Sequence, residues 1–230
     1  MPEQLLIVTV DGPAGAGKSA AARGLARRLG LPYLDTGAMY RAVGLAAARA
    51  GVPFPLDEEG AERAVEVARR IRIEFRDGEP TQRVLLDGED VTAELRRPEA
   101  SRRASMVSVV PGVRRAMVVR QRELATRSGG VVEGRDIGTV VFPDAPVRIF
   151  LTASPEVRAH RRFEELQRQG VPARWEDVLA EQQDRDRRDA ERSDSPMRPA
   201  AGAVVFDTST LGLEEVVAQL LALVRNILSP

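Results

Sequence analysis

The 230-residue sequence contains no cysteine and only one histidine, His160. Without cysteine the chain can form no disulfide bond, no thiolate metal site and no cysteine nucleophile. A single histidine also leaves little material for a Ser-His-Asp arrangement. The composition therefore disfavours most of the familiar hydrolase chemistries.

The sequence also lacks an excess of charge of one sign and any long apolar run. Lysine and arginine total 34, as do aspartate and glutamate, so the net charge is zero. No overall positive field is available to hold a nucleic acid or to attract the protein to an anionic membrane. No apolar run reaches the roughly 18 residues of a membrane span, and the N-terminus does not resemble a secretory signal. We therefore expect a cytoplasmic protein of enzyme size, without nucleic-acid or membrane partners.

The pattern of apolar residues predicts alternating strands and helices, which is the signature of an α/β fold. The apolar run Leu5–Val10 is typical of a strand buried on both faces of a parallel sheet. Further strands are expected near 33–34, 130–133, 147–151 and 203–207, and helices at 18–29, up to about 50, 113–127 and 155–170. A last helix is expected to pack one apolar face on the sheet, formed by Leu213, Val216, Val217, Leu220, Val224, Ile227 and Leu228.

One segment breaks this rhythm. Residues 71–92 alternate apolar and polar side chains, and Asp77-Gly78 and Asp87-Gly88 are turn signals within them. This pattern predicts a small antiparallel meander inserted into the α/β body.

Lys18 is the only lysine, so the remaining 33 of the 34 basic residues are arginines. It lies in the stretch Gly12-Pro-Ala-Gly-Ala-Gly17-Lys18-Ser19, which matches the phosphate-loop pattern GxxxxGK[ST] after a buried strand and at the start of a helix. Glycines let backbone N–H groups converge on a phosphate, and the helix N-terminus adds partial positive charge. A lysine fits beneath the phosphates where the wider arginine fork would crowd the loop. Ser19 can place its hydroxyl on Mg²⁺.

Other interpretations of this region are weaker. Gly15-x-Gly17-x-x-Ala20 also fits a dinucleotide fingerprint, with Asp35 as a ribose-binding acid. In that fold, however, the first glycine directly follows the strand, whereas here four residues separate Val10 from Gly15. A guanine-specific site needs a second lysine, which the chain lacks. Glu133, at the end of a predicted strand, is either a carboxylate that holds Mg²⁺ through water or a solvent-facing strand end.

A phosphoryl-transfer site must neutralise two anionic nucleotides, so arginines should converge on it. Arg41 follows Thr36 and Tyr40 at the start of a helix near the mouth of the phosphate loop, and Arg135 and Asp136 follow a core strand at the edge where ligands bind. Two further groups share helix faces by their spacing: Arg158 with Arg162, and Arg185, Arg188, Asp189 and Arg192. Two alternatives remain open, namely an exposed salt-bridged helix at 184–192 and a simple turn ion pair at Arg135-Asp136. Arg168 and Arg187 are expected on the surface.

Taken together, the motifs resemble the bacterial-type cytidylate kinases, a family of nucleoside monophosphate kinases. The resemblance covers nearly the whole chain and is carried, in order, by DGPAGAGKS, LDTGAMYRA, LDGEDVT, EGRDIGTVVFPDAPVRIFL, RAHRR, QQDRDRRDAER and DTSTLGLEEV. It implies a P-loop three-layer α/β sandwich with a central parallel sheet, an inserted antiparallel meander and a short helical lid. It implies one kinase domain over 1–230, with a core of 1–35, 108–153 and 200–230, a monophosphate-binding region of 36–107 and a lid region of 154–192.

The resemblance also implies an activity and a set of roles. The expected reaction is transfer of the γ-phosphate of ATP to CMP or dCMP, with Mg²⁺, by a monomer. The expected catalytic residues are Lys18, Arg135, Arg162 and Arg192. ATP would be bound by Gly12, Pro13, Ala14, Gly15, Ala16, Gly17, Lys18, Ser19 and Arg158. CMP would be bound by Thr36, Tyr40, Arg41, Ser105, Arg114, Arg135, Asp136, Arg185, Asp189 and Arg192, and Mg²⁺ by Ser19 and Glu133.

Within the second set the resemblance assigns separate parts of CMP. Arg41, Arg135 and Arg192 would hold its phosphate, Arg185 and Asp189 its sugar, and Ser105, Arg114 and Asp136 its cytosine. The sequence departs from the commonest family pattern at Thr36, where serine is frequent, and at Glu133, where aspartate is frequent. The nearest rival functions are an adenylate or uridylate kinase and a non-catalytic nucleotide sensor.

Overall fold

The computed structural model describes residues 5–76, 78, 82–192 and 194–229. The chain forms two compact units. The first contains the described residues up to Leu34 and from Ala125 onward, and the second runs from Asp35 to Leu124. Residues 108–124 thus belong to the second unit, whereas the predicted boundary placed them in the core. Each unit is described by itself below.

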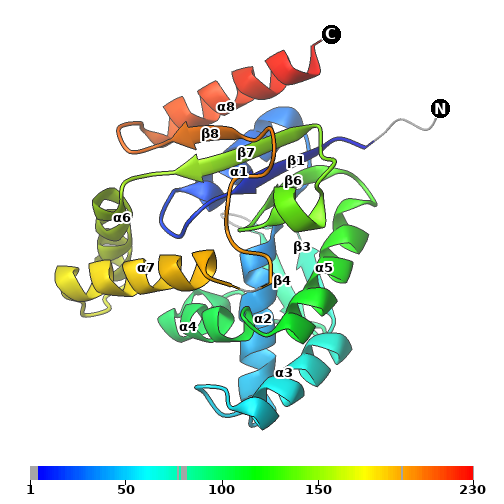
Figure 1. Ribbon diagram of the computed structural model, residues 1–230, viewed down its shortest axis with the longest axis vertical. Coiled ribbons are helices and arrows are strands. Elements are labelled where there is room, and N and C mark those ends of the chain that lie inside the picture. The colour runs from blue at the N-terminus through cyan, green and yellow to red at the C-terminus, as the bar shows by residue number, and fades with distance from the viewer. Residues whose placement is uncertain (1–4, 77, 79–81, 193, 230) are drawn as a thin grey trace. The chain divides into compact units, whose positions relative to one another are not determined.

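A five-stranded sheet forms the centre of the first unit (Figure 1). Its strands follow the order β2 (Tyr33–Asp35), β6 (Gly130–Glu133), β1 (Ile7–Asp11), β7 (Val147–Thr152) and β8 (Val204–Asp207). The pairs β1–β6, β1–β7 and β7–β8 are parallel, as predicted. In β1, Val8, Thr9 and Val10 are fully buried, which confirms a strand covered on both faces. The strand begins at Ile7, two residues later than predicted, and Leu5 before it is 49% exposed.

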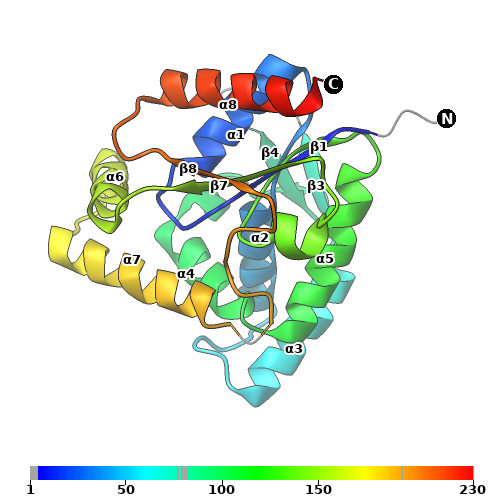
Figure 2. The same ribbon diagram turned by 45° about the horizontal axis from the view of Figure 1, so that its top comes forward.

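Helices α1 (Lys18–Leu29) and α8 (Leu213–Leu228) pack together over this sheet (Figure 2). Their close approach depends on Gly24, where a Cβ would lie 2.7 Å from Cγ2 of Val217. The predicted apolar face of α8 is only partly correct: Val216, Val217, Leu220 and Val224 are buried, but Leu213, Ile227 and Leu228 are exposed. The buried positions lie in the middle of α8, and the exposed ones lie at its two ends.

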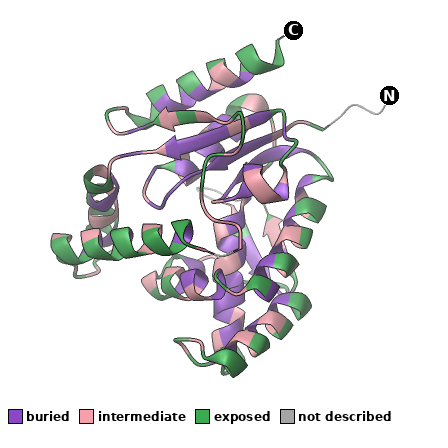
Figure 3. Ribbon diagram, in the orientation of Figure 1, coloured by how far each residue is buried: buried purple, intermediate pink, exposed green. Residues whose placement is uncertain are grey.

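Helix α6 (Pro155–Arg168) corresponds to the helix predicted at 155–170, and α7 (Trp175–Ala190) follows it. They pack through a small apolar cluster of Ala159, Leu166 and Val178. Ser154 caps α6 by accepting a hydrogen bond from the backbone N–H of Val157 at 3.2 Å, and Gly170 follows the helix with a φ of 68°, as the sequence predicted. Much of α7 is exposed (Figure 3).

The second unit contains four helices in its described part: α2 (Thr36–Arg49), α3 (Glu58–Arg70), α4 (Pro98–Val107) and α5 (Pro111–Ala125). A short 3₁₀ turn, η1 (Glu94–Arg96), precedes α4. Helices α3 and α4 were not predicted from the sequence. Gly44 lets α2 approach α4, since a Cβ there would lie 2.8 Å from Cβ of Arg103.

The predicted meander is confirmed as an antiparallel sheet of β3 (Ile73–Arg76), β4 (Arg83–Leu86) and β5 (Glu89–Asp90). Asp87 and Gly88 join β4 to β5 with φ values of 51° and 90°, which fits the turn type that an Asp-Gly pair favours in a hairpin. Asp77 of the other expected turn lies outside the described residues. Within the described part of the chain, no helix is both long and apolar enough to cross a membrane.

Candidate functional site

The loop between β1 and α1 has the backbone of a phosphate-binding loop. Gly12, Gly15 and Gly17 have φ values of 141°, 78° and 82°, which favour glycine. Two of these positions also leave no room for a side chain, because a Cβ at Gly12 would lie 1.9 Å from the carbonyl oxygen of Leu151 and one at Gly15 would lie 2.8 Å from Cβ of Arg158. The loop leads directly into α1, so the backbone N–H groups at the helix start remain available to an anion.

Lys18 lies at the start of α1 and is 5% exposed. Its Nζ donates a hydrogen bond to the carbonyl oxygen of Pro13 at 2.6 Å. Burial, and after it the positive charge of Arg135, lower the pKa of Lys18 to about 7. A phosphate placed in the loop would favour the charged ammonium, so the site is built to be completed by an anion.

A short chain of hydroxyl and carboxylate groups connects α1, β6 and β2. The hydroxyl of Ser19 donates to Oε1 of Glu133 at 2.8 Å, and the hydroxyl of Tyr33 donates to Oε2 at 2.9 Å. Glu133 is 5% exposed, which contradicts its interpretation as a solvent-facing strand end. Sequence reasoning did not identify Tyr33, whose role depends on the pairing of distant strands.

These oxygen ligands have the chemistry that Mg²⁺ requires. The ion is commonly bound by one or two protein oxygens together with substrate phosphates and water. In the described residues no cluster of three or more His, Cys, Asp or Glu side chains could hold a metal by itself. Ser19 and Glu133 therefore fit a shared metal site completed by a ligand.

Two arginines of α6 form hydrogen bonds with other segments: Arg158 with the phosphate loop, and Arg161 with the segment after β8. Arg158 is 5% exposed, and it donates to the carbonyl oxygens of Ala153 at 2.9 Å and Ala14 at 3.2 Å and to the carboxylate of Asp186 at 2.5 Å. Arg161 donates to the carbonyl oxygen and the hydroxyl of Thr208 at 2.7 and 3.0 Å.

Thr208 in turn connects this helix to the phosphate loop. Its side chain is buried, and its hydroxyl donates to the carbonyl oxygens of Ala16 and Thr152, each at 3.1 Å. Arg162, on the same helix, is partly exposed and pairs with Glu165 at 2.7 Å. Helix α6 thus carries one partly exposed arginine, Arg162, and two arginines, Arg158 and Arg161, that are hydrogen-bonded to other segments of the first unit.

The first unit gathers several of the predicted acceptor residues around Asp189. The carboxylate of Asp189 accepts from Nε of Arg135 at 3.0 Å and from Arg192. Burial raises the pKa of Asp189, but Arg135, Arg192 and Arg185 together outweigh it and lower the pKa below its ordinary value. Arg135 therefore pairs with Asp189, so a simple turn ion pair with its neighbour in sequence is not what the structure shows.

The predicted arginine face of α7 needs correction. Arg188 is exposed and its Nε donates to the backbone of Asp184, away from the Asp189 group. The helix also ends at Ala190, so Arg192 lies beyond it and reaches Asp189 from an irregular segment. Arg187 pairs with Asp184 on the surface, and Arg168 is exposed, both as predicted.

The second unit holds the other predicted acceptor residues. Thr36, Tyr40 and Arg41 come from the first two turns of α2. Asp35 caps this helix by accepting from the N–H of Ala38 at 2.8 Å, and its other oxygen accepts from Arg41 at 2.8 Å. Both oxygens of Asp35 are thus occupied, which disfavours a ribose-binding role and the dinucleotide interpretation.

Ser105 and Arg114 come from α4 and α5 and are 6% and 2% exposed. The Ser105 hydroxyl has no hydrogen-bond partner among the described residues. A buried hydroxyl without a partner is costly, and a ligand could satisfy it. The Arg114 guanidinium lies 5.9 Å from the centre of the Tyr40 ring, so these two predicted residues lie together.

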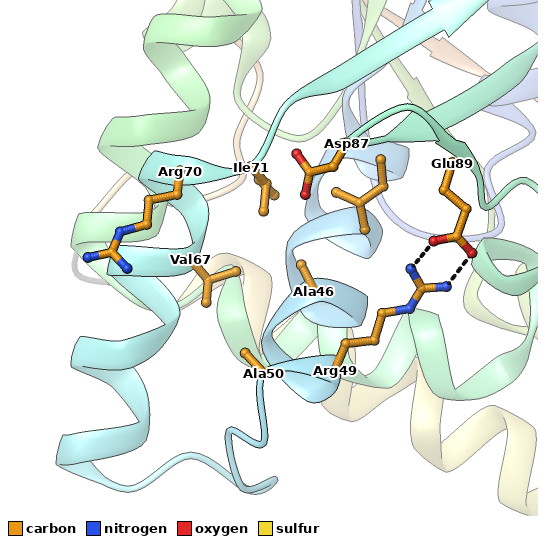
Figure 4. A pocket seen from close by; sticks show the side chains of 9 residues that line it. Ala46, Arg49, Ala50, Val67, Arg70, Ile71, Asp87 and Glu89 are labelled. Carbon is orange, nitrogen blue, oxygen red and sulfur yellow. Dashed lines mark hydrogen bonds and ion pairs between the residues drawn. The ribbon is translucent and has the colours of Figure 1, made fainter.

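A pocket in the second unit lies elsewhere on α2 (Figure 4). Its lining includes Ala46 of α2, Ala50 directly after that helix, Val67 of α3 and Leu86 of β4, and Arg49, also in the lining, is hydrogen-bonded to Glu89. Ala46 is ten residues beyond Thr36, which corresponds to about 15 Å along a helix. The pocket is therefore separate from the predicted acceptor residues of this helix.

Comparison with known proteins adds independent findings. The family model of cytidylate kinase matches residues 8–226. The chain is 47% identical to a cytidylate kinase of Solibacter usitatus (strain Ellin6076) over 226 residues, which cover 97% of this chain and 94% of that protein. It is 48% identical to a cytidylate kinase of Caldanaerobacter subterraneus subsp. tengcongensis, over 95% of this chain and 94% of the relative. A longer relative from Synechococcus sp. (strain JA-2-3B'a(2-13)), a bifunctional pantoate ligase/cytidylate kinase, is 46% identical over 99% of this chain and 42% of its own length.

Proposed function

The chain belongs to the cytidylate kinase family, and on that premise we propose that it transfers the γ-phosphate of ATP to CMP and dCMP. The products are ADP and the corresponding cytidine diphosphate. The observation that carries the proposal is the buried Lys18 beneath a phosphate loop, in the same unit as a buried carboxylate held by two arginines.

The donor side is assigned to the loop of residues 12–19. Its backbone N–H groups and Lys18 would bind the phosphates of ATP, and Arg158 would hold the loop through the carbonyl oxygen of Ala14. A phosphoryl-transfer site needs charge stabilisation and alignment rather than covalent chemistry. No general base is required, because the acceptor phosphate is already an anion at neutral pH.

Mg²⁺ would be held at Ser19, with Glu133 acting through water. When bound, the ion would neutralise charge on the ATP phosphates. The contribution of this chain is to fix the Ser19 hydroxyl by its hydrogen bond to Glu133, whose second oxygen is held by Tyr33.

The acceptor side is assigned to the residues that the family resemblance implies. Arg41, Arg135 and Arg192 would bind the phosphate of CMP, and Arg185 and Asp189 its sugar. Thr36 and Tyr40 would complete the binding of the nucleotide. The cytosine would be recognised by Ser105, Arg114 and Asp136.

This last assignment has a chemical basis. A carboxylate can accept a hydrogen bond from the exocyclic amine of cytosine, while serine and arginine donate to its ring nitrogen and carbonyl. Uracil has a carbonyl in place of the amine, so it would offer no hydrogen-bond donor to the carboxylate of Asp136. A loss of up to about 10⁴-fold is typical of such a mismatch in a tightly built site.

The helical pair α6–α7 is assigned to a lid that closes over ATP. Closure would keep water from the γ-phosphate, which would otherwise be hydrolysed. Arg162 is the arginine of this pair that we assign to the transferred phosphate, because its side chain is partly exposed and forms its ion pair with an exposed glutamate on its own helix.

The test is ADP release from ATP in a coupled assay, with CMP, dCMP, UMP or AMP as acceptor. We expect turnover with CMP and dCMP and much less with UMP and AMP. ATP binding without turnover on any acceptor would instead indicate a nucleotide sensor, and a preference for UMP or AMP would refute the cytosine assignment.

Arg192 offers a matched pair of variants with Arg187. Arg192→Ala removes a predicted phosphate ligand, whereas Arg187→Ala removes an exposed arginine that pairs with Asp184 on the surface. We expect the first change to reduce kcat/KM for CMP by about 10² or more and the second to leave it nearly unchanged. Equal effects would argue against the acceptor assignment.

The proposal includes a monomer that acts in the cytoplasm, where ATP and CMP are available. Light scattering at assay concentration should then give a mass near 25.1 kDa. A dimer mass would contradict this part of the proposal alone.

A further inference from the structure

Asp11 is a buried carboxylate to which the proposed reaction assigns no role. It is the last residue of β1 and is 3% exposed. Its two oxygens accept hydrogen bonds from the backbone N–H groups of Ile137 at 2.8 Å and Gly138 at 2.7 Å. The bonded residues are 126 and 127 positions away in the sequence, so the contact joins two separate segments of the first unit.

The partner segment is a short turn, η2 (Ile137–Val141), that directly follows Arg135 and Asp136. Within it, the N–H of Val140 donates to the carbonyl oxygen of Asp136 at 2.9 Å, and that of Phe142 donates to Ile137 at 2.7 Å. Asp136, at the start of this turn, supplies no side-chain cap. Asp11 therefore supplies the acceptors that the first N–H groups of a helical turn need.

Asp11 also immediately precedes the phosphate loop, and its strand is packed tightly against the same turn. A Cβ at Gly138 would lie only 2.9 Å from the hydroxyl oxygen of Thr9, two residues before Asp11. The N–H of Gly134, next to Arg135, donates to the carbonyl oxygen of Val10 at 3.0 Å. The segment of Arg135 and Asp136 is thus anchored to β1 on both of its sides.

We infer that Asp11 is a positioning residue for the acceptor nucleotide: its carboxylate fixes the turn that carries Arg135 and Asp136 relative to the phosphate loop. This inference rests on the proposed function. In-line transfer needs the acceptor phosphate aligned with the donor, and a displacement of about 1 Å can cost about 10²-fold in rate. Asp11 touches neither substrate in this role and acts through the backbone of the turn.

The electrostatics of Asp11 show that its position has a cost. Burial is the main reason why its pKa is raised to about 6; nearby Asp136 also acts to raise the pKa, and the two N–H bonds and Lys18 act to lower it. An apolar residue would avoid the burial cost but would leave two buried N–H groups without acceptors. A carboxylate is the side chain that can accept from both at once.

The test compares Asp11→Asn with Thr9→Val. The amide of Asn keeps the shape of the side chain but turns one acceptor into a donor, so one of the two bonds to the turn is lost. Thr9 is equally buried in the same strand, and its hydroxyl has no hydrogen-bond partner among the residues that the structure describes. Thr9→Val therefore controls for a polar change within β1.

We expect Asp11→Asn to lower kcat/KM for CMP by about 10- to 100-fold and to reduce the preference for CMP over UMP, with KM for ATP changed by less than about twofold. Thr9→Val should change none of these. Equal losses for ATP and CMP, or an Asp11→Asn enzyme that matches Thr9→Val, would overturn the inference. If the wild-type enzyme does not phosphorylate CMP, the proposed function fails instead.

A measurement on the wild-type protein covers the case in which Asp11→Asn does not fold. The amide protons of Ile137 and Gly138 should shift together as pH changes, because both bond to one titrating carboxylate whose charged neighbours are Asp136 and Lys18. NMR should give both signals the same midpoint. Amide signals that do not move together would show that Asp11 does not hold the turn.

Discussion

Lys18 gives the sharpest prediction, because it is the only lysine in the chain. Protein labelled with ¹³C in lysine should therefore show a single set of lysine side-chain signals, which report the protonation of this one ammonium group. We expect it to titrate with a pKa near 7 in the free protein and to return toward its usual range when ATP binds. The physical reason is that burial disfavours the charged form, and the ATP phosphates favour it again.

The magnitude follows from the pKa values. With a pKa of about 7, Lys18 is only about 10% charged at pH 8, so binding of ATP at pH 8 should take up about 0.9 proton. A lysine with an ordinary pKa near 10.4 would take up fewer than about 0.01 protons at that pH. Because binding takes up a proton, the affinity for ATP should fall as pH rises, by nearly tenfold per unit above about pH 8.

The uptake can be measured by calorimetry of ATP binding without CMP, at pH 8, in two buffers that differ in ionisation enthalpy. The phosphates of ATP contribute little at this pH, since the last ionisation of a phosphate ester lies near pH 6. Lys18→Met removes the titrating group while keeping a long side chain, and it should abolish the buffer dependence of whatever binding remains. A free-protein midpoint near 10, together with no proton uptake, would refute the argument from burial.

Three further predictions test the fold and the donor site. Leu220→Ala should lower the free energy of unfolding by about 2–5 kcal/mol, because it opens a cavity in a fully buried position. Leu213→Ala, at the exposed end of the same helix, should change the free energy of unfolding by less than about 0.5 kcal/mol. Chemical denaturation measures both values, and similar losses would contradict the packing of α8. Thr208→Val should raise KM for ATP, because it removes the hydroxyl that joins Arg161 to the carbonyl oxygen of Ala16. Thr208→Ser keeps a hydroxyl and should return KM toward the wild-type value. Steady-state kinetics that give the two variants the same KM would exclude this role. Arg162→Ala should lower turnover more than it weakens CMP binding, and equal losses in the two quantities would count against its place in the lid.

Much of the first unit could be predicted because local patterns decide it. The apolar run of β1 and the glycines before Lys18 each require one kind of local structure. Likewise Ser154 caps the start of α6, and Gly170 lies just after its end, as expected of residues that terminate a helix. These features depend on neighbours in the sequence, so the sequence alone indicates them.

The errors arise where distant segments decide the outcome. The spacing of Leu213 and Leu228 indicates one helix face, but only the tertiary packing of α8 determines how much of that face is covered. Helical spacing grouped Arg188 with Asp189, yet it could not show that the helix ends at Ala190. The partners of Glu133 and of Asp11 lie about a hundred or more residues away, and a sequence pattern does not reveal such pairs.

The ends of the strands show how contacts between distant residues affect a phosphate site. Four of the five strands of the parallel sheet end in an acidic residue, namely Asp11, Asp35, Glu133 and Asp207. Carboxylates at the ligand-binding edge of such a sheet would oppose an anionic substrate if they were free. Each of the four instead accepts at least two hydrogen bonds, from backbone N–H groups, hydroxyls or an arginine. Their charge is thereby used to position donors, and the attraction of the phosphates falls to the loop backbone, Lys18 and the arginines.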